Sequence, residues 1–154
     1  MKKQVRLLCM MALIAIMGLT SCTKKPEDLI VGKWKITEFR MRYSDGSNAC
    51  DFDATGETWT FKENGSFIGC IPIENDIVPD YYFTSKYIVE GEELTIRGGD
   101  FEYYYEDGFC EEVVFVLDID EITKDELSVS GKWKFYEGGE LEESASISAS
   151  FKRK

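Results

Sequence analysis

Three segments in the second half of the chain place an apolar residue at every second position, and this alternation constrains the fold more than any other feature. The segments cover residues 113–119, 127–135 and 145–151, and serine, lysine or aspartate fills most of the intervening positions. Successive side chains of a β-strand point to opposite faces of a sheet, so a period of two is typical of a half-buried strand. We therefore predict an all-β fold.

Turn residues divide residues 30–154 into eight expected strands: 33–43, 57–62, 66–71, 81–89, 93–105, 111–119, 126–136 and 144–153. The connections after the second, fourth and sixth strands are short, and Asn64-Gly65 is a hairpin signal that requires positive φ at both positions. The connections over 44–56, 72–80 and 137–143 are longer and fall at the opposite end. This pattern predicts a single antiparallel up-and-down eight-stranded barrel with one tight end and one open mouth.

The first 21 residues have the composition of a cleaved secretory signal peptide. Three basic residues precede an apolar run from Leu7 to Leu19, and small residues follow it. The run is shorter than the roughly 20 residues that a membrane-spanning helix needs. Leu19-Thr20-Ser21-Cys22 resembles the lipobox of bacterial lipoproteins, although a cysteine after an ordinary signal is the alternative. The resemblance implies cleavage before Cys22 and its acylation with chains such as palmitate.

These features divide the chain into a lipoprotein signal peptide (1–21), a lipidated tether (22–29) and a barrel domain (30–154). The expected location is the bacterial cell envelope, with the membrane as a partner through the acyl anchor at Cys22. Thr23 stands where an aspartate would resemble an inner-membrane retention signal, which favours the outer membrane. Whether the domain faces the periplasm or the outside is left open.

Charge and composition favour a binding protein over an enzyme. Removal of Lys2, Lys3 and Arg6 with the signal leaves 15 of the 18 basic residues against 29 acidic ones, a formal charge of −14. Such a surface is a poor partner for nucleic acid, and we interpret its acidity as solubility rather than cation binding. The absence of histidine excludes Ser-His-Asp and Cys-His catalysis. No spacing typical of a metal or cofactor site is present, and we expect neither.

Three cysteines follow the predicted anchor, and all of them fall at the expected mouth. Cys50, Cys70 and Cys110 would lie in a compartment that oxidises thiols, so one disulfide and one free thiol are the simplest outcome. The strand order favours the pair Cys50–Cys70, but Cys110 could replace either partner.

Gly32-Lys33-Trp34 opens the first strand, residues 122–127 form a turn into a strand, and Phe151-Lys152-Arg153-Lys154 closes the last one. On these motifs the chain resembles bacterial lipocalin-like lipoproteins, whose barrels are of the calycin type. The resemblance implies that Trp34 plugs the closed end of the barrel and that a basic residue, Arg153 first and Lys152 second, lies across its ring. The chain departs from many lipocalins in having no expected helix after the last strand.

Large aromatic side chains alternate toward the expected interior, and this leaves two functions open. An eight-stranded barrel has room either for packed side chains or for one small ligand. The first function is binding of a small apolar or amphipathic ligand inside the barrel. The second is a packed barrel whose mouth loops engage a protein or glycan. The candidate ligand-binding residues are Trp59, Phe83, Tyr87, Phe115 and Trp133.

Overall fold

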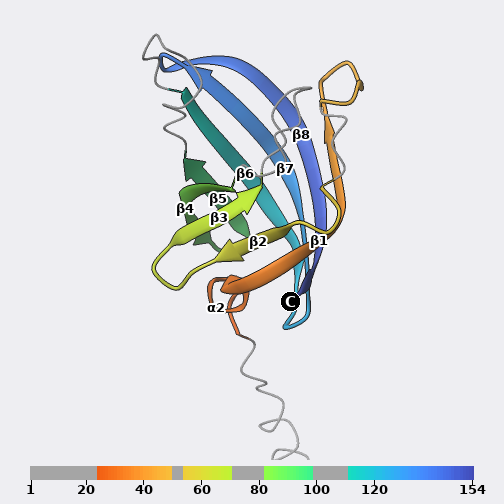
Figure 1. Ribbon diagram of the computed structural model, residues 1–154, viewed down its shortest axis with the longest axis vertical. Coiled ribbons are helices and arrows are strands. Elements are labelled where there is room, and N and C mark those ends of the chain that lie inside the picture. Colours follow the sequence, from red (N-terminus) through yellow and green to blue (C-terminus); the bar gives the residue numbers. More distant parts are fainter. Residues whose placement is uncertain (1–23, 50–53, 71–81, 99–110) are drawn as a thin grey trace, which may run out of the picture.

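The chain folds into a closed antiparallel β-barrel. The computed structural model describes residues 24–49, 54–70, 82–98 and 111–154. Within these segments a short helix, α2 (Pro26–Ile30), precedes eight strands: β1 (Gly32–Arg42), β2 (Thr58–Phe61), β3 (Ser66–Cys70), β4 (Tyr82–Glu90), β5 (Glu93–Gly98), β6 (Glu111–Ile122), β7 (Glu126–Glu137) and β8 (Glu140–Arg153). Each strand pairs with its neighbours in the chain, and β8 pairs with β1 (Figure 1). The predicted eight-stranded up-and-down barrel is confirmed.

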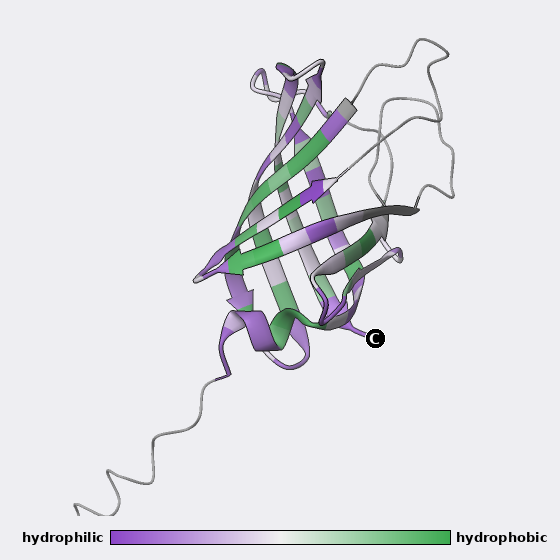
Figure 2. Ribbon diagram, turned by 90° about the vertical axis from the view of Figure 1, so that its left-hand side faces the viewer, coloured by the Kyte–Doolittle hydropathy of each residue, from purple (hydrophilic) through white to green (hydrophobic). Residues whose placement is uncertain are grey.

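The alternation in sequence becomes an inner and an outer face of the barrel. In β8 the apolar residues from Ala145 to Phe151 are buried, whereas the serines between them lie on the outside. Figure 2 shows hydrophobic and hydrophilic stretches following one another along the strands. Apolar residues of all the strands thus face one interior, and burial of this apolar surface drives closure of the sheet.

The two ends of the barrel differ as the turn lengths predict. The short turns β2–β3, β4–β5 and β6–β7 lie at one end, called here the closed end, where α2 and the end of β8 also lie (Figure 1). The expected conformation of the first of these turns is wrong in one detail. Gly65 has φ +78, but no described residue other than glycine has a positive φ. Asn64 instead accepts a hydrogen bond from the Ser66 backbone N–H through its side chain, at 3.1 Å.

The expected long connection over residues 137–143 is wrong. β7 continues to Glu137 and β8 begins at Glu140, so that only Gly138 and Gly139 connect the two strands. Both glycines have positive φ, +59 and +87. This backbone twist matches that of a hairpin, and glycine adopts it without steric cost. The β7–β8 hairpin therefore extends further toward the mouth than the sequence indicates.

Part of the segment expected to be a polar tether is helical. Of its described residues, 24–29, those from Pro26 onward lie in α2, whose last residue, Ile30, is fully buried under the barrel. Strand β6 is also longer than expected, because a bulge between Ile119 and Glu121 lets the pairing with β7 continue to Ile122. The expected strand over 93–105 is described only to Gly98.

The signal peptide and Cys22 lie outside the described residues. No described helix has the length and apolar character that crossing a bilayer requires.

Candidate functional site

The closed end is built around Trp34, the first inward-facing residue of β1. Its side chain is fully buried, and its indole Nε1 donates a hydrogen bond to the Ile30 carbonyl at 2.6 Å. The Arg153 guanidinium lies 4.2 Å from the centroid of the indole ring. Such a cation over a tryptophan face contributes about 0.5–2 kcal/mol, depending on how far the pair is removed from water. The structure thus brings Trp34 and Arg153 together, while Lys152 lies exposed.

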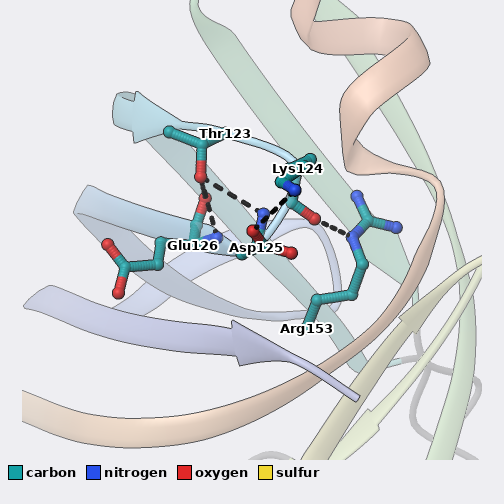
Figure 3. Close-up of polar contacts among 5 residues, drawn as sticks. All are labelled: Thr123, Lys124, Asp125, Glu126 and Arg153. Atoms are coloured by element: carbon teal, nitrogen blue, oxygen red, sulfur yellow. Dashed lines mark hydrogen bonds and ion pairs between the residues drawn. The ribbon is translucent and has the colours of Figure 1, made fainter.

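Arg153 also joins three segments of backbone at this end. Its Nη1 donates to the Val31 carbonyl at 2.8 Å, its Nη2 donates to the Leu29 carbonyl, and its Nε donates to the Lys124 carbonyl at 2.5 Å. Figure 3 shows the last of these bonds, with the β6–β7 turn beside Arg153. The last carbonyls of a helix have no partner within the helix. Arg153 and Trp34 supply partners at the end of α2, so they attach this helix to the barrel.

The β6–β7 turn is held in shape by Thr123. Its hydroxyl accepts hydrogen bonds from the backbone N–H groups of Asp125 and Glu126, at 3.2 and 3.0 Å (Figure 3). Threonine hydroxyls commonly stabilise turns in this way. The Thr123 side chain therefore fixes the turn from which Lys124 presents its carbonyl to Arg153.

Gly32 is required at the closed end for two reasons. Its φ of +142 lies in a region that side-chain-bearing residues rarely adopt. A Cβ atom at this position would lie 2.5 Å from Nη1 of Arg153, whose guanidinium is already held by three carbonyls. The absence of a side chain at Gly32 therefore leaves room for the Arg153 guanidinium beside the Trp34 ring.

We expect Arg153→Lys to lower the free energy of unfolding by about 1–3 kcal/mol, because lysine keeps the charge but cannot reproduce the geometry of the guanidinium. Loss of the bonds to Leu29 and Val31 should also loosen α2, so trypsin should cleave faster after Lys24, just before this helix. Urea unfolding followed by circular dichroism, together with a proteolysis time course, measures both effects.

The matched control for this substitution is Arg97→Lys, the same change at an exposed arginine of β5. It should alter neither unfolding nor cleavage. Equal behaviour of the two variants would contradict a role for Arg153 in holding α2.

Above Trp34, the half of the interior nearest the closed end is filled by aromatic rings centred on Trp59. The Trp59 ring lies 5.2 Å from that of Phe67 and 5.8 Å from that of Phe115, both edge-on, and 5.0 Å from that of Phe151. All four side chains are buried. Edge-on and tilted pairs at these distances are favourable packing arrangements. Two of the candidate ligand-binding residues, Trp59 and Phe115, therefore contact other rings of the core.

Tyr87, a third candidate, lies at the margin of this cluster. Its ring is 5.0 Å from that of Phe61, and its hydroxyl donates to the Lys62 carbonyl at 2.9 Å. Burial raises the pKa of the Tyr87 phenol, and the Glu63 carboxylate adds to the rise. Tyr87 thus remains a neutral donor near physiological pH. It also borders an open surface groove of about 850 Å³ beneath the closed end, where lysines and carboxylates of opposite sign intermix.

The other half of the interior, toward the mouth, combines apolar walls with unpartnered polar atoms. We call the inward-facing positions of Ser85, Val113, Trp133, Phe135 and Ala145 the mouth half. Trp133 is 4% exposed and Ser85 is 6% exposed. Among the described residues, Trp133 Nε1 and Ser85 Oγ are the two buried side-chain polar atoms that have no hydrogen-bond partner. Native proteins contain few such atoms, and each one calls for an explanation.

Several predicted site residues lie outside the described part of the structure. These are Cys22, Cys50 and Cys110, together with the side chains of Cys70 and Phe83. The disulfide and the lipidation therefore stay predictions. Within the described segments, no group of three or more acidic or cysteine side chains could hold a metal ion.

Ser85 was not predicted as a site residue. It alternates with Phe83 and Tyr87, both of which were expected in the interior, so the same period of two places the Ser85 hydroxyl there as well. The contacts of Leu29, Val31 and Lys124 had no such signal, because Arg153 meets their backbone carbonyls and not their side chains.

The fold and the closed end define the class of protein: an eight-stranded up-and-down antiparallel barrel, plugged at one end by a tryptophan and an arginine. In comparisons with known proteins, no family model, curated protein or solved structure matches the chain.

Proposed function

We propose that the protein is a lipid-anchored binding protein of the bacterial cell envelope that holds one small apolar or amphipathic molecule in the mouth half of its barrel. The observation that carries this proposal is the pair of buried, unpartnered polar atoms, Trp133 Nε1 and Ser85 Oγ, on otherwise apolar walls. Binding sites for small molecules have this composition: mostly apolar surface with a few polar groups that orient the ligand.

The division of the interior supports the same assignment. Aromatic packing around Trp59 makes the closed half a rigid floor, and the small side chain of Ala145 lies beside Trp133 on the neighbouring strand. An eight-stranded barrel of this kind holds one small ligand at most. The proposed ligand therefore rests on the aromatic floor and enters from the mouth. The resemblance to lipocalin-like lipoproteins, carried by Gly32, Trp34 and Arg153, agrees with an interior site.

The position of α2 supports an orientation on the membrane. Three residues separate the proposed anchor at Cys22 from Pro26, and an extended segment of that length spans about 10 Å. Since α2 lies under the closed end, an acylated Cys22 holds this end near the bilayer. The mouth then faces away from the membrane that carries the anchor, where ligand can reach it.

The experiment uses residues 23–154, which include α2 and the whole barrel. We expect native mass spectrometry to detect a bound molecule that is released on denaturation, and the neutral fluorescent probe N-phenylnaphthylamine to bind the emptied protein. A protein that carries no ligand and binds no probe would contradict the proposal. That outcome would favour the packed barrel that engages a protein or glycan through its mouth loops.

A matched pair of variants locates the site. Ala145 is buried on the inner face of β8, and its neighbour Ser146 is exposed on the outer face. We expect Ala145→Leu to reduce probe affinity at least about tenfold by filling the mouth half, which corresponds to roughly 1.4 kcal/mol. Ser146→Leu should leave affinity unchanged. Circular dichroism verifies that both variants are folded, and equal affinities would place the probe elsewhere.

A further inference from the structure

Resting on the proposed function, we propose that the barrel selects ligands with an uncharged hydrogen-bond acceptor, such as the carbonyl oxygen of an ester, ketone or amide, which receives the N–H of Trp133 and the O–H of Ser85. A buried polar group without a partner costs about as much as a lost hydrogen bond. The indole N–H can only donate. An acceptor on the ligand is therefore the group that satisfies it.

The two donors lie at inward-facing positions on different strands of the barrel. Trp133 on β7 pairs with Phe115 on one side and with Ala145 on the other, and all three side chains are buried. Ser85 on β4 pairs with the buried Phe67. β4 and β7 are separated by β5 and β6 around the barrel, so the two side chains extend inward from well-separated strands.

The ring of Trp133 is also held in place. It stacks on the Phe135 ring, with centroids 6.3 Å apart and an angle of 13° between the planes. A donor on a ring fixed by packing is preorganised, because binding does not have to restrict its rotation. The indole N–H therefore acts as the orienting contact, and the apolar body of the ligand lies against the surrounding side chains.

The surroundings disfavour a negatively charged acceptor such as the carboxylate of a free fatty acid. The basic residues on the adjoining parts of β4, β5 and β7 alternate with the inward residues and so lie on the outer face: Lys86, Arg97, Lys132 and Lys134.

One charge on the inner face, among the residues that the structure describes, is itself negative. Glu143 is half-buried and pairs with Phe135, on the same face as Ala145. Burying a carboxylate without a cationic partner is costly, and Glu143 and the formal charge of −14 that remains after signal removal oppose it further. A neutral carbonyl has the required lone pairs without this cost.

The test compares three competitors of equal chain length: methyl laurate, lauric acid and dodecane. Each displaces N-phenylnaphthylamine from residues 23–154 at pH 7, and the concentration for half displacement gives its relative affinity. We expect methyl laurate to bind roughly tenfold more tightly than dodecane, as one satisfied buried hydrogen bond allows. Lauric acid should bind less tightly than methyl laurate.

Two variants separate hydrogen bonding from shape. Trp133→Phe removes the N–H but keeps an aromatic ring beside Phe135, and Ser85→Ala removes only a hydroxyl. Both variants should lower the ratio of methyl laurate affinity to dodecane affinity. Trp133→Phe should bring this ratio nearly to one, even if it changes the affinity for dodecane itself. Ser85→Ala changes the side-chain volume only slightly, so this variant still tests the inference if Trp133→Phe does not fold.

The outcomes distinguish this inference from the proposed function. If the probe and all three competitors fail to bind, the interior site itself is wrong. If they bind but wild-type protein does not prefer methyl laurate over dodecane, or if the preference survives in both variants, the interior site stands and the inference about its chemistry is overturned. Tightest binding by lauric acid would also overturn it.

Discussion

Replacing Trp34 with alanine should lower the free energy of unfolding by about 3–5 kcal/mol, the range for truncation of a large buried aromatic residue. The indole is fully buried, forms the plug of the closed end, and supports the Arg153 guanidinium at 4.2 Å from its ring centroid. Truncation removes this packing and leaves the Ile30 carbonyl without its hydrogen bond. Urea unfolding followed by far-ultraviolet circular dichroism measures the change without relying on tryptophan fluorescence.

A matched pair of milder substitutions isolates the hydrogen bond. Trp34→Phe and Trp133→Phe remove the same atoms from two buried tryptophans. Of these two residues, Trp34 donates a hydrogen bond from its Nε1 to the Ile30 carbonyl, whereas Nε1 of Trp133 has no partner. Trp34→Phe should therefore be more destabilising than Trp133→Phe, by about 1–3 kcal/mol. Equal losses would indicate that packing alone stabilises the closed end.

Gly131→Ala should also be strongly destabilising, because no side chain fits between β6 and β7 at this position. A Cβ atom on Gly131 would lie 2.2 Å from the Val116 carbonyl oxygen and 2.8 Å from Cα of Leu117. Both are backbone atoms, so the strands themselves must separate. Overpacking of this kind costs about 1–3 kcal/mol and occasionally more, and we expect the upper part of that range.

Gly139→Ala is the control for this substitution. Gly139 has φ +87 in the β7–β8 turn, and nothing lies within 4 Å of the position that a Cβ atom would take. Alanine there is strained in its backbone but meets no neighbour, so the expected cost is about 1–2 kcal/mol. Thermal unfolding of both variants compares the two costs. A smaller loss for Gly131→Ala than for Gly139→Ala would contradict the close approach of β6 and β7.

Much of the barrel could be predicted because its strands and turns are specified by residues that are close together in the sequence. The alternation from Ala145 to Phe151 and the turn residues between strands together define strand number and order. The short β7–β8 turn and the start of β8 escaped prediction because Glu137, Glu140 and Glu142 resemble a loop in composition. In a hairpin that extends toward the mouth, such charged side chains lie in water on a strand without cost.

Features that depend on tertiary contacts could not be predicted. Helix α2 has five residues, too few for a helical period to be visible, and isolated helices of this length are unstable. Its stability comes from burial of Ile30 and from the hydrogen bonds of Arg153 to Leu29 and Val31. The unpartnered N–H of Trp133 was equally invisible, because alternation predicts which face a side chain occupies but not whether a polar atom on that face finds a partner.

The closure of β1 against β8 has a consequence for how the protein folds. Every other strand pairing joins segments that are adjacent in the chain, whereas Arg153 and Val31 meet across 122 positions. Loop-closure entropy makes such distant contacts slow to form. The hairpins can therefore assemble first, and the β1–β8 seam completes the barrel last. Arg153 holds α2 at this seam. The helix that links the barrel to its proposed membrane anchor therefore packs against the barrel only in the final step of folding.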